Sequence, residues 1–469
     1  MLKANNVFCA QIPSKAYGPA PNVGCPELPQ WAKRTTALAA FRSLLVQAGL
    51  DHAHLELPYW NPLRDIVEDK KVVLKPNWVM HQNASGYDLG CLITHTSILA
   101  AILQYVAKAR PRSIVVGDAP LQGCDFESLQ VNSGTIEMIE RFSKNGIGVQ
   151  VKDFRRTIRR DSRLQTMAQE HCLPFDNFIL YDLGGASSLE EISTPSSEFR
   201  VTMYDPKLLK RTHGPGKHQY LIARDIIEAD VVINVPKLKT HNKACITGAL
   251  KNLVGINGHK EYLPHHRKGS PDDGGDCYCD RSPVKALLED LLDAANQANG
   301  EVSRWLLANA VRGGMAFAKI LNLDDNYEGS WHGNDTVWRM TLDLQRILHY
   351  GKQDGTLADS PQRTVLTVTD AIIAGEGDGP LAPTPIGLGM MTMGTSTAAV
   401  EWVNALLMGL RPDRIPLTRE AFAYNRYLLA DFSPRDIAVS VDGQPISVDE
   451  LFPRYGRAFR LPKGWSETV

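Results

Sequence analysis

The five residues 231–235, VVINV, constrain the fold of this chain more than any other stretch. Four of them are Val or Ile, whose branched side chains suit a strand that is covered on both faces, as in parallel sheets. Pro236 ends the run, because proline has no backbone N–H to donate to a neighbouring strand. The groups that follow Pro236 are therefore expected at the carboxyl end of a buried strand.

Basic and polar residues gather directly after that strand. Residues 230–268 hold seven Lys or Arg against two acids, whereas the whole 469-residue chain has a net charge of −1. In open α/β sheets, ligands bind beyond the carboxyl ends of strands, and helix N-termini there offer free N–H groups to anions. The block predicts an anion-binding cradle with the candidates Lys237, Lys239, His241, Lys251 and Asn252. A solvated basic loop is the alternative, and no Walker or Gly-x-Gly-x-x-Gly motif indicates a nucleotide.

Other short apolar runs predict further buried strands, at 72–74, 113–117, 149–154 and 363–369. Helical patterns lie between several of them, and strands that alternate with helices form parallel sheets with right-handed crossovers. The predicted fold class is α/β, with a mainly parallel sheet, helices on both faces, an inserted lobe and a helical segment.

Changes in pattern along the chain suggest four regions. A Pro-rich extended arm is expected at 1–30, and a first α/β lobe at 31–154. Turn-rich and alternating sequence predicts an inserted hairpin or flap at 155–219. A second α/β lobe follows at 220–469 and contains the helical segment 284–350.

The predicted strands deliver further polar groups at their carboxyl ends. These candidates for substrate binding or proton transfer are Lys75, Asn77, His95, Asp118, Asp370 and Glu376. Each has a purely structural alternative: an acid at a strand end can cap a turn, and Thr96 or Ser97 can cap the helix that begins beside His95. We expect Asp118 and Asp370 to form a carboxylate rim that faces the Lys/His block.

Composition narrows the class of protein. Balanced charge and a pI near 6.9 argue against a nucleic-acid or membrane-surface role. No run of about 18 apolar residues and no signal-peptide core is present, so a cytoplasmic protein without a membrane span is expected. Eight scattered cysteines favour reduced thiols, and Cys277 with Cys279 is a poor metal signature because the usual spacing is Cys-x-x-Cys.

Several motifs resemble the uncharacterised family catalogued as domain of unknown function 362. The matching blocks are PKLKTH (236–241), TGALKNLVG (247–255), LPHHRKGSPDDGGD (263–276), KPNWV (75–79), GDAP (117–120) and DAIIAGEGDGP (370–380). The segment GSWHGNDTVWRMTLDLQRIL (329–348) resembles a subgroup associated with bacterial surface-polysaccharide gene clusters, which implies a role in polysaccharide biosynthesis. Some members carry a ferredoxin module, but this chain lacks its closely spaced cysteines.

Three functional hypotheses remain open at this point. The first is an enzyme for a small phosphorylated or carboxylated molecule, which the subgroup resemblance would make a sugar phosphate or nucleotide sugar. Lysines would hold the anion, and Lys239, His241, Asp118 or Asp370 would move protons, with Lys239 also able to form a covalent adduct.

The second is a metal or redox enzyme of racemase or epimerase type, since the N-terminal half distantly resembles nickel-dependent lactate racemase-type enzymes; a divalent metal is the candidate cofactor. The third is a non-catalytic metabolite-binding protein. Substrate, reaction and oligomeric state are left open.

Overall fold

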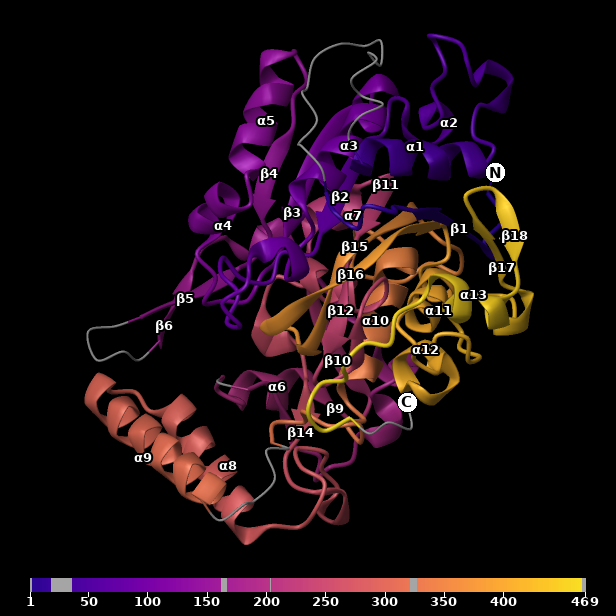
Figure 1. Ribbon diagram of the computed structural model, residues 1–469. Coiled ribbons are helices and arrows are strands. Elements are labelled where there is room, and N and C mark those ends of the chain that lie inside the picture. The colour runs from indigo at the N-terminus through magenta and orange to yellow at the C-terminus, as the bar shows by residue number, and fades with distance from the viewer. Residues whose placement is uncertain (1, 18–35, 162–166, 203, 321–326, 466–469) are drawn as a thin grey trace.

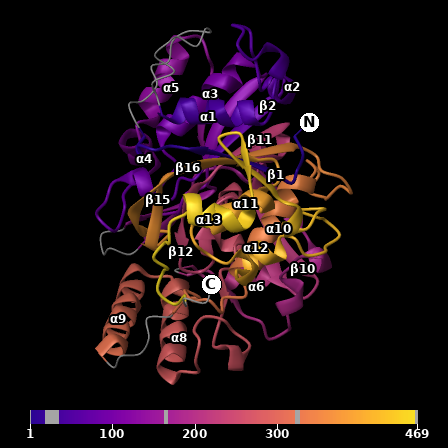
Figure 2. The same cartoon turned by 45° about the vertical axis from the view of Figure 1, so that its right-hand side comes forward.

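A large mixed sheet runs through the centre of the protein. The computed structural model describes residues 2–465 apart from 18–35, 162–166, 203 and 321–326. Eleven strands form the sheet, nine of them in the order β18-β17-β1-β16-β15-β11-β2-β3-β4, with β12 and β13 branching from β15. Helices cover both faces (Figures 1 and 2), which confirms the predicted α/β fold class.

The predicted buried strands form the parallel half of the sheet. They are β2 (Lys71–Pro76), β3 (Ser113–Asp118), β4 (Gln150–Asp153), β11 (Val231–Val235) and the first part of β15 (Thr364–Asp378). All four pairings between these strands are parallel. Their carboxyl ends therefore meet at one edge, as a sheet of this type requires.

The other half of the sheet is mixed. It contains β16 (Ala382–Gly394), β1 (Asn6–Gln11), β17 (Ala438–Val441) and β18 (Gln444–Ile446). β1 lies between β16, to which it is antiparallel, and β17, to which it is parallel. Of the arm predicted for 1–30, residues 6–11 thus pair within the sheet, and 18–30 lie outside the described residues.

Two segments expected to be loops or turns are strands. The prediction that a strand ends at Asp370 is wrong, because β16 returns antiparallel and keeps β15 paired as far as Asp378. The PKLKTH segment forms β12 (Lys237–His241), which pairs parallel to β15 and antiparallel to β13 (Cys245–Thr247). The lysines of this segment thus belong to the sheet, where their side chains are buried.

The sheet separates two hydrophobic cores. Along β2, Val72 and Leu74 pack into one core and Val73 into the other, as the alternation of a strand dictates. The first core is covered by α1 (Thr36–Gln47), α2 (Arg64–Val67), α3 (Thr96–Lys108), α4 (Phe126–Asn132) and α5 (Thr135–Lys144). The second is covered by α7 (Arg224–Glu228), α10 (Val337–Tyr350), α11 (Thr397–Leu407), α12 (Pro416–Glu420) and α13 (Val448–Tyr455).

Smaller sheets and a helical hairpin complete the molecule. One smaller sheet has three strands: β7 (Phe178–Asp182), β10 (Lys217–Ala223) and β9 (His213–Gly214). Two others have two strands each: β8 (Phe199–Arg200) with β14 (His266–Arg267), and β5 (Thr157–Asp161) with β6 (Met167–His171). The short helix α6 (Lys207–Thr212) lies near them. α8 (Pro283–Gln297) and α9 (Glu301–Ile320) project from the body as a pair (Figures 1 and 2).

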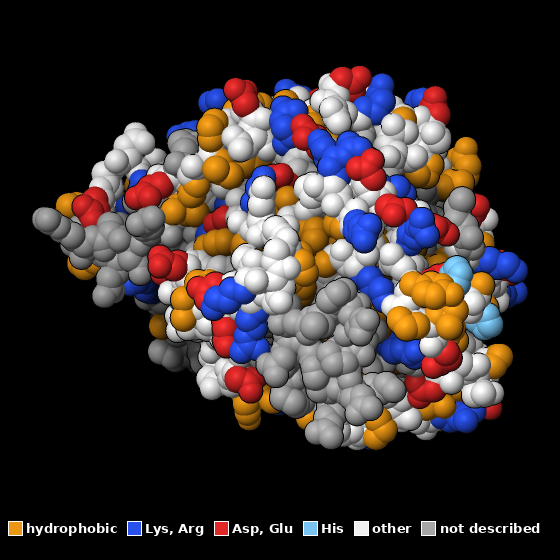
Figure 3. Space-filling view, turned by 90° about the horizontal axis from the view of Figure 1, so that it is seen from above, with side chains coloured by type: hydrophobic (Ala, Val, Ile, Leu, Met, Phe, Trp, Pro, Cys, Tyr) orange, Lys and Arg blue, Asp and Glu red, His pale blue; other side chains and the backbone are white. Residues whose placement is uncertain are grey.

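On the face seen in Figure 3, positively charged Lys and Arg side chains are interspersed with negatively charged Asp and Glu side chains. Among the described residues, none of the helices has both the length and the apolar character needed to cross a membrane.

Candidate functional site

A buried ion pair joins the ends of β2 and β3. Lys75 Nζ lies 2.7 Å from Asp118 Oδ1, and both side chains are almost completely buried. The backbone N–H of Trp78 donates to Asp118 Oδ2 at 2.7 Å. Asn252 Oδ1 accepts from Lys75 Nζ at 2.9 Å and from Asn77 Nδ2 at 3.0 Å. Four residues predicted from different parts of the sequence therefore form one hydrogen-bonded cluster.

Gly255 allows the backbone to pass directly over this pair. A Cβ atom at this position would lie 1.9 Å from Asp118 Oδ1 and 2.6 Å from Lys75 Nζ. Any other residue would collide with the pair, so the glycine is required by close approach rather than by its φ angle.

A second buried ion pair joins β12 to β15. Lys237 Nζ is 2.6 Å from Asp370 Oδ2, and both side chains are fully buried. Tyr17 Oη donates to Asp370 Oδ1 at 2.8 Å, and the backbone N–H of His95 donates to Asp370 Oδ2 at 2.9 Å. The rings of Tyr17 and His95 stack with centroids 3.7 Å apart. Lys237 thus balances the charge of Asp370, and both carboxylate oxygens of Asp370 accept hydrogen bonds.

His95 also caps the N-terminus of α3, a role for which Thr96 and Ser97 were the candidates from the sequence. It is the N-cap of α3, and its Nδ1 accepts from the backbone N–H of Ser97 at 3.2 Å. Burial lowers the pKa of His95 to about 4, so the ring is neutral and Nδ1 is free to accept. The prediction that Thr96 or Ser97 caps this helix is therefore wrong.

Two further lysines of the site have no carboxylate partner among the described residues. Lys239 is fully buried, and its Nζ donates to the backbone carbonyl of Leu92. Lys251 is 8% exposed, and the described residues supply no hydrogen-bond partner for its side chain. Burial and the charge of Lys237 hold the pKa of Lys239 well below its usual value. Burial and the charges of Lys260, Lys243 and Lys75 lower the pKa of Lys251 to about 7.

These two lysines lie close enough to both ion pairs to interact with them electrostatically. The charges of Lys237, Asp118 and Lys251 affect the pKa of Lys239, and the charge of Lys75 affects the pKa of Lys251. Lys260, whose Nζ donates to the Ala119 carbonyl at 2.7 Å, adds another buried cation. The arrangement therefore has more buried cations than carboxylates.

Two histidines face the same group with complementary hydrogen-bonding capacity. His241 Nδ1 accepts from the backbone N–H of Lys243 at 3.0 Å, which leaves its Nε2–H as a donor. His265 Nδ1 lies 2.7 Å from the Leu263 carbonyl and donates to it, which leaves its Nε2 as an acceptor. Burial and the charge of Lys251 hold the pKa of both rings well below the usual value. One neutral donor and one neutral acceptor are therefore available to a ligand.

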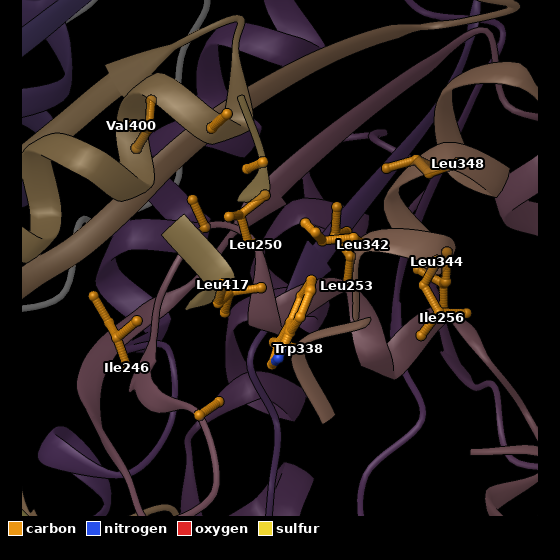
Figure 4. Close-up of a cluster of buried hydrophobic side chains, with 14 of the residues drawn as sticks. Ile246, Leu250, Leu253, Ile256, Trp338, Leu342, Leu344, Leu348, Val400 and Leu417 are labelled. Atoms are coloured by element: carbon orange, nitrogen blue, oxygen red, sulfur yellow. The ribbon is translucent and has the colours of Figure 1, made fainter. Parts of the chain in front are cut away.

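Lys251 and Asn252 lie on the 3-10 helix η7 (Lys251–Ile256), a segment that is held by packing against the hydrophobic core. They lie at its start, and its Leu253 and Ile256 pack in an apolar cluster with α10 (Figure 4). Glu401 of α11 accepts from the backbone N–H of Ala249 at 2.6 Å. Burial raises the pKa of Glu401 to about 8.

Not every predicted residue joins the group. Glu376 lies in β15 rather than in a turn, and its Oε2 accepts from the backbone N–H of Arg460 at 2.9 Å. Tyr17, Lys260 and Glu401 were missed. Tyr17 and Glu401 belong to no motif that indicates chemistry, whereas Lys260 belongs to the basic block that singled out its neighbours.

Comparison with known proteins gives a partial identification. The family model described as Domain of unknown function (DUF362) matches residues 193–405. This match covers less than half of the chain and shows similarity to DUF362 over that region. The matched region includes β11, β12, η7 and β15, and so contains Lys237, Lys239, Lys251 and Asp370 of the site. No curated protein is significantly similar to the chain.

Two solved structures resemble the chain weakly. A Thermotoga maritima protein is 11% identical, with a TM-score of 0.33 and coverage of 79% of this chain and 59% of its own. The lactate racemase apoprotein of Thermoanaerobacterium thermosaccharolyticum is 11% identical, with a TM-score of 0.28 and coverage of 73% and 51%. This chain thus spans little more than half the length of either.

Proposed function

We propose that this protein is an enzyme that acts on a small anionic molecule held by Lys239 and Lys251. The observation that carries the proposal is that both lysines are buried without a carboxylate partner among the described residues. A buried, uncompensated ammonium costs several kcal/mol. A bound phosphate or carboxylate would supply the missing countercharge through charge-assisted hydrogen bonds.

The ligand would approach from the side of His241 and Lys251, which keep 6% and 8% of their surface exposed. Lys239 would lie at the bottom of the site, and the neutral His241 and His265 rings would contact hydroxyl groups of the substrate. A phosphorylated or carboxylated sugar derivative, the class implied by resemblance to the polysaccharide-associated subgroup, offers both kinds of group.

Catalysis rather than sensing alone is favoured by the lowered pKa of Lys251. With a value of about 7, the amine exists in both protonation states near neutral pH and can take or give a proton. This property supports proton transfer, as in a racemase or epimerase, as the second candidate function. A protein that only senses an anion would need the charge without this tuning.

Binding measurements with Lys239→Met test the proposal. Methionine keeps the length and apolar character of the side chain but removes the charge. Loss of one charge-assisted contact costs about 1.5–3 kcal/mol, so calorimetry should show affinity for inorganic phosphate or sulfate lower by roughly one to two decades. Lys217→Met, at an exposed lysine, is the control and should bind as the parent does. Equal affinity of Lys239→Met and the parent would refute the anion site.

The pH dependence of sulfate binding tests the role of Lys251. Sulfate keeps its charge near neutral pH, so a change in affinity reports on the protein. A bound anion favours the protonated amine, and affinity should therefore fall as pH rises above about 7, with proton uptake on binding at pH 8. Calorimetry in buffers of different ionisation enthalpy measures that uptake. Binding that is independent of pH between 6 and 9 would exclude Lys251.

A further inference from the structure

Three buried side chains with metal-binding donor atoms meet near Lys243. The donor atoms of His266, Cys277 and Glu289 all lie within 4.8 Å of one another. They come from β14, from the loop after it and from α8. Cys277 and Glu289 are separated by a spacing that matches no standard motif, which explains why the cysteine pattern alone gave no metal prediction.

The loop that carries Cys277 is folded back tightly on itself. The backbone N–H of Cys277 donates to the Gly269 carbonyl at 2.9 Å, and the backbone N–H of Gly269 donates to Glu289 Oε2 at 3.0 Å. A Cβ atom on Gly275 would lie 2.0 Å from the Lys268 carbonyl oxygen. The thiol of Cys277 also hydrogen-bonds the Glu289 carboxylate directly, so the two donor groups are already held together.

The ends of this loop are anchored as well. Asp276 Oδ2 accepts from Thr336 Oγ1 at 2.6 Å and from the backbone N–H of Asp335 at 2.9 Å. The backbone N–H of Gly329 donates to the Cys277 carbonyl at 2.8 Å. A donor set held from several sides in this way needs little reorganisation to bind a cation.

His266 lacks a partner for one ring nitrogen. Its Nδ1 makes no hydrogen bond to the described residues, although the side chain is only 4% exposed. A buried polar atom left without a partner is energetically costly, so such atoms ordinarily have a ligand, an ion or a water. This orphaned nitrogen is an observation independent of the grouping of the three donors.

A small cavity lies next to the donors. It has a volume of about 20 Å³ and is lined by residues that include His266, Glu289, Thr202, Tyr327 and Glu328. This is enough room for one water molecule. Tyr327 Oη is buried and has no hydrogen-bond partner among the described residues. A water in the cavity could therefore complete a fourth coordination position and accept a hydrogen bond from Tyr327.

We propose that His266, Cys277 and Glu289 bind a zinc ion, with a water as the fourth ligand. One thiolate, one imidazole and one carboxylate form a donor set that zinc accepts, and the two anionic donors balance its charge. Tetrahedral zinc requires donor separations of roughly 3.3–3.8 Å, so the three side chains need to close in only slightly. The site is separate from the ion pairs of the proposed substrate site and goes beyond that function.

Metal analysis of purified, dialysed protein tests the proposal directly. We expect one zinc per chain, and cobalt substitution should give a thiolate-to-cobalt charge-transfer absorption band. Cys277→Ser should abolish that band, and His266→Gln and Glu289→Gln should each lower zinc affinity by at least tenfold. Cys279→Ser is the matched control and should retain both zinc and the band. Zinc retained at full affinity by Cys277→Ser would overturn the proposal.

X-ray absorption on the zinc-loaded parent protein keeps the test decisive if the variants do not fold. It should show one sulfur at about 2.3 Å and three nitrogen or oxygen neighbours at about 2.0–2.2 Å. A first shell without sulfur, or parent protein that binds neither zinc nor cobalt, would rule the site out.

Discussion

At the scale of single residues, the site contains two lysine–carboxylate ion pairs and further lysines that have no carboxylate partner among the described residues. The members of each pair depend on each other, because removal of one leaves a bare charge in the interior. Lys75 and Asp118 show this most clearly, since both are almost fully buried and 2.7 Å apart.

We predict that Lys75→Met destabilises the protein by about 3–5 kcal/mol, the usual cost of breaking a buried pair from one side. The double variant Lys75→Met with Asp118→Asn should recover most of the loss, because no uncompensated charge remains. Urea unfolding of the parent, the single and the double variant measures both quantities. A double variant no more stable than the single one would contradict this account.

The sequence identified these residues but not their partners. Lys75, Asp118, Lys237 and Asp370 were all expected at one rim, yet which lysine meets which carboxylate depends on the order of strands in the sheet. Tyr17 lies more than 350 positions from Asp370 along the chain, and no local pattern connects them. The complete burial of Lys239 follows from the pairing of β12 with β15, which the sequence pattern did not predict.

At the scale of elements, the strands with β-branched cores were predictable and the continuation of β15 was not. Residues 370–378, DAIIAGEGD, include Gly, Glu and Asp, which are depleted in strands. Tertiary contacts keep them extended, because β16 pairs with them antiparallel and β12 pairs with them parallel. The position of η7 likewise depends on distant elements, α10 and α11, and on Glu401 in particular.

The raised pKa of Glu401 predicts a pH-dependent stability. Between its ordinary value of 4.5 and about 8, the folded protein keeps a proton that the unfolded chain has lost. Stability should therefore fall as pH rises through this range, by about 5 kcal/mol in total. Glu401→Gln lacks this loss, so its Tm relative to the parent should increase from pH 5 to pH 9. Glu56→Gln, at an exposed glutamate, is the control, and parallel Tm profiles for parent and Glu401→Gln would contradict the expectation.

At the scale of the whole molecule, β1 joins the two ends of the chain. Cys9 has Thr392 as its antiparallel partner and Val441 as its parallel partner. Its neighbours in β1 alternate between the two hydrophobic cores, with Val7 in one and Phe8 in the other. Little in the sequence indicates this strand, because it is short and adjoins Pro- and Gly-rich residues.

Thiol labelling tests whether this strand opens by itself. Cys9 is completely buried, and burial together with the charge of Asp442 raises the pKa of its thiol. We expect Cys9 to be modified only through global unfolding, so that its labelling free energy has the same urea dependence as the equilibrium transition. Cys172, which is exposed, should react at once. Labelling of Cys9 that is insensitive to urea would show local opening instead.

The position of β1 also affects how the protein is made. β1 leaves the ribosome well before its partner residues in β16 and β17, which are encoded roughly 380 and 430 residues later. At a synthesis rate of about 5–20 residues per second, the unpaired strand waits for roughly 20–90 s. Tyr17, which follows β1 and contacts Asp370, waits with it. The nascent chain therefore exposes an apolar strand while the residues between β1 and its partners are synthesised, and the half of the site around Asp370 forms only after that.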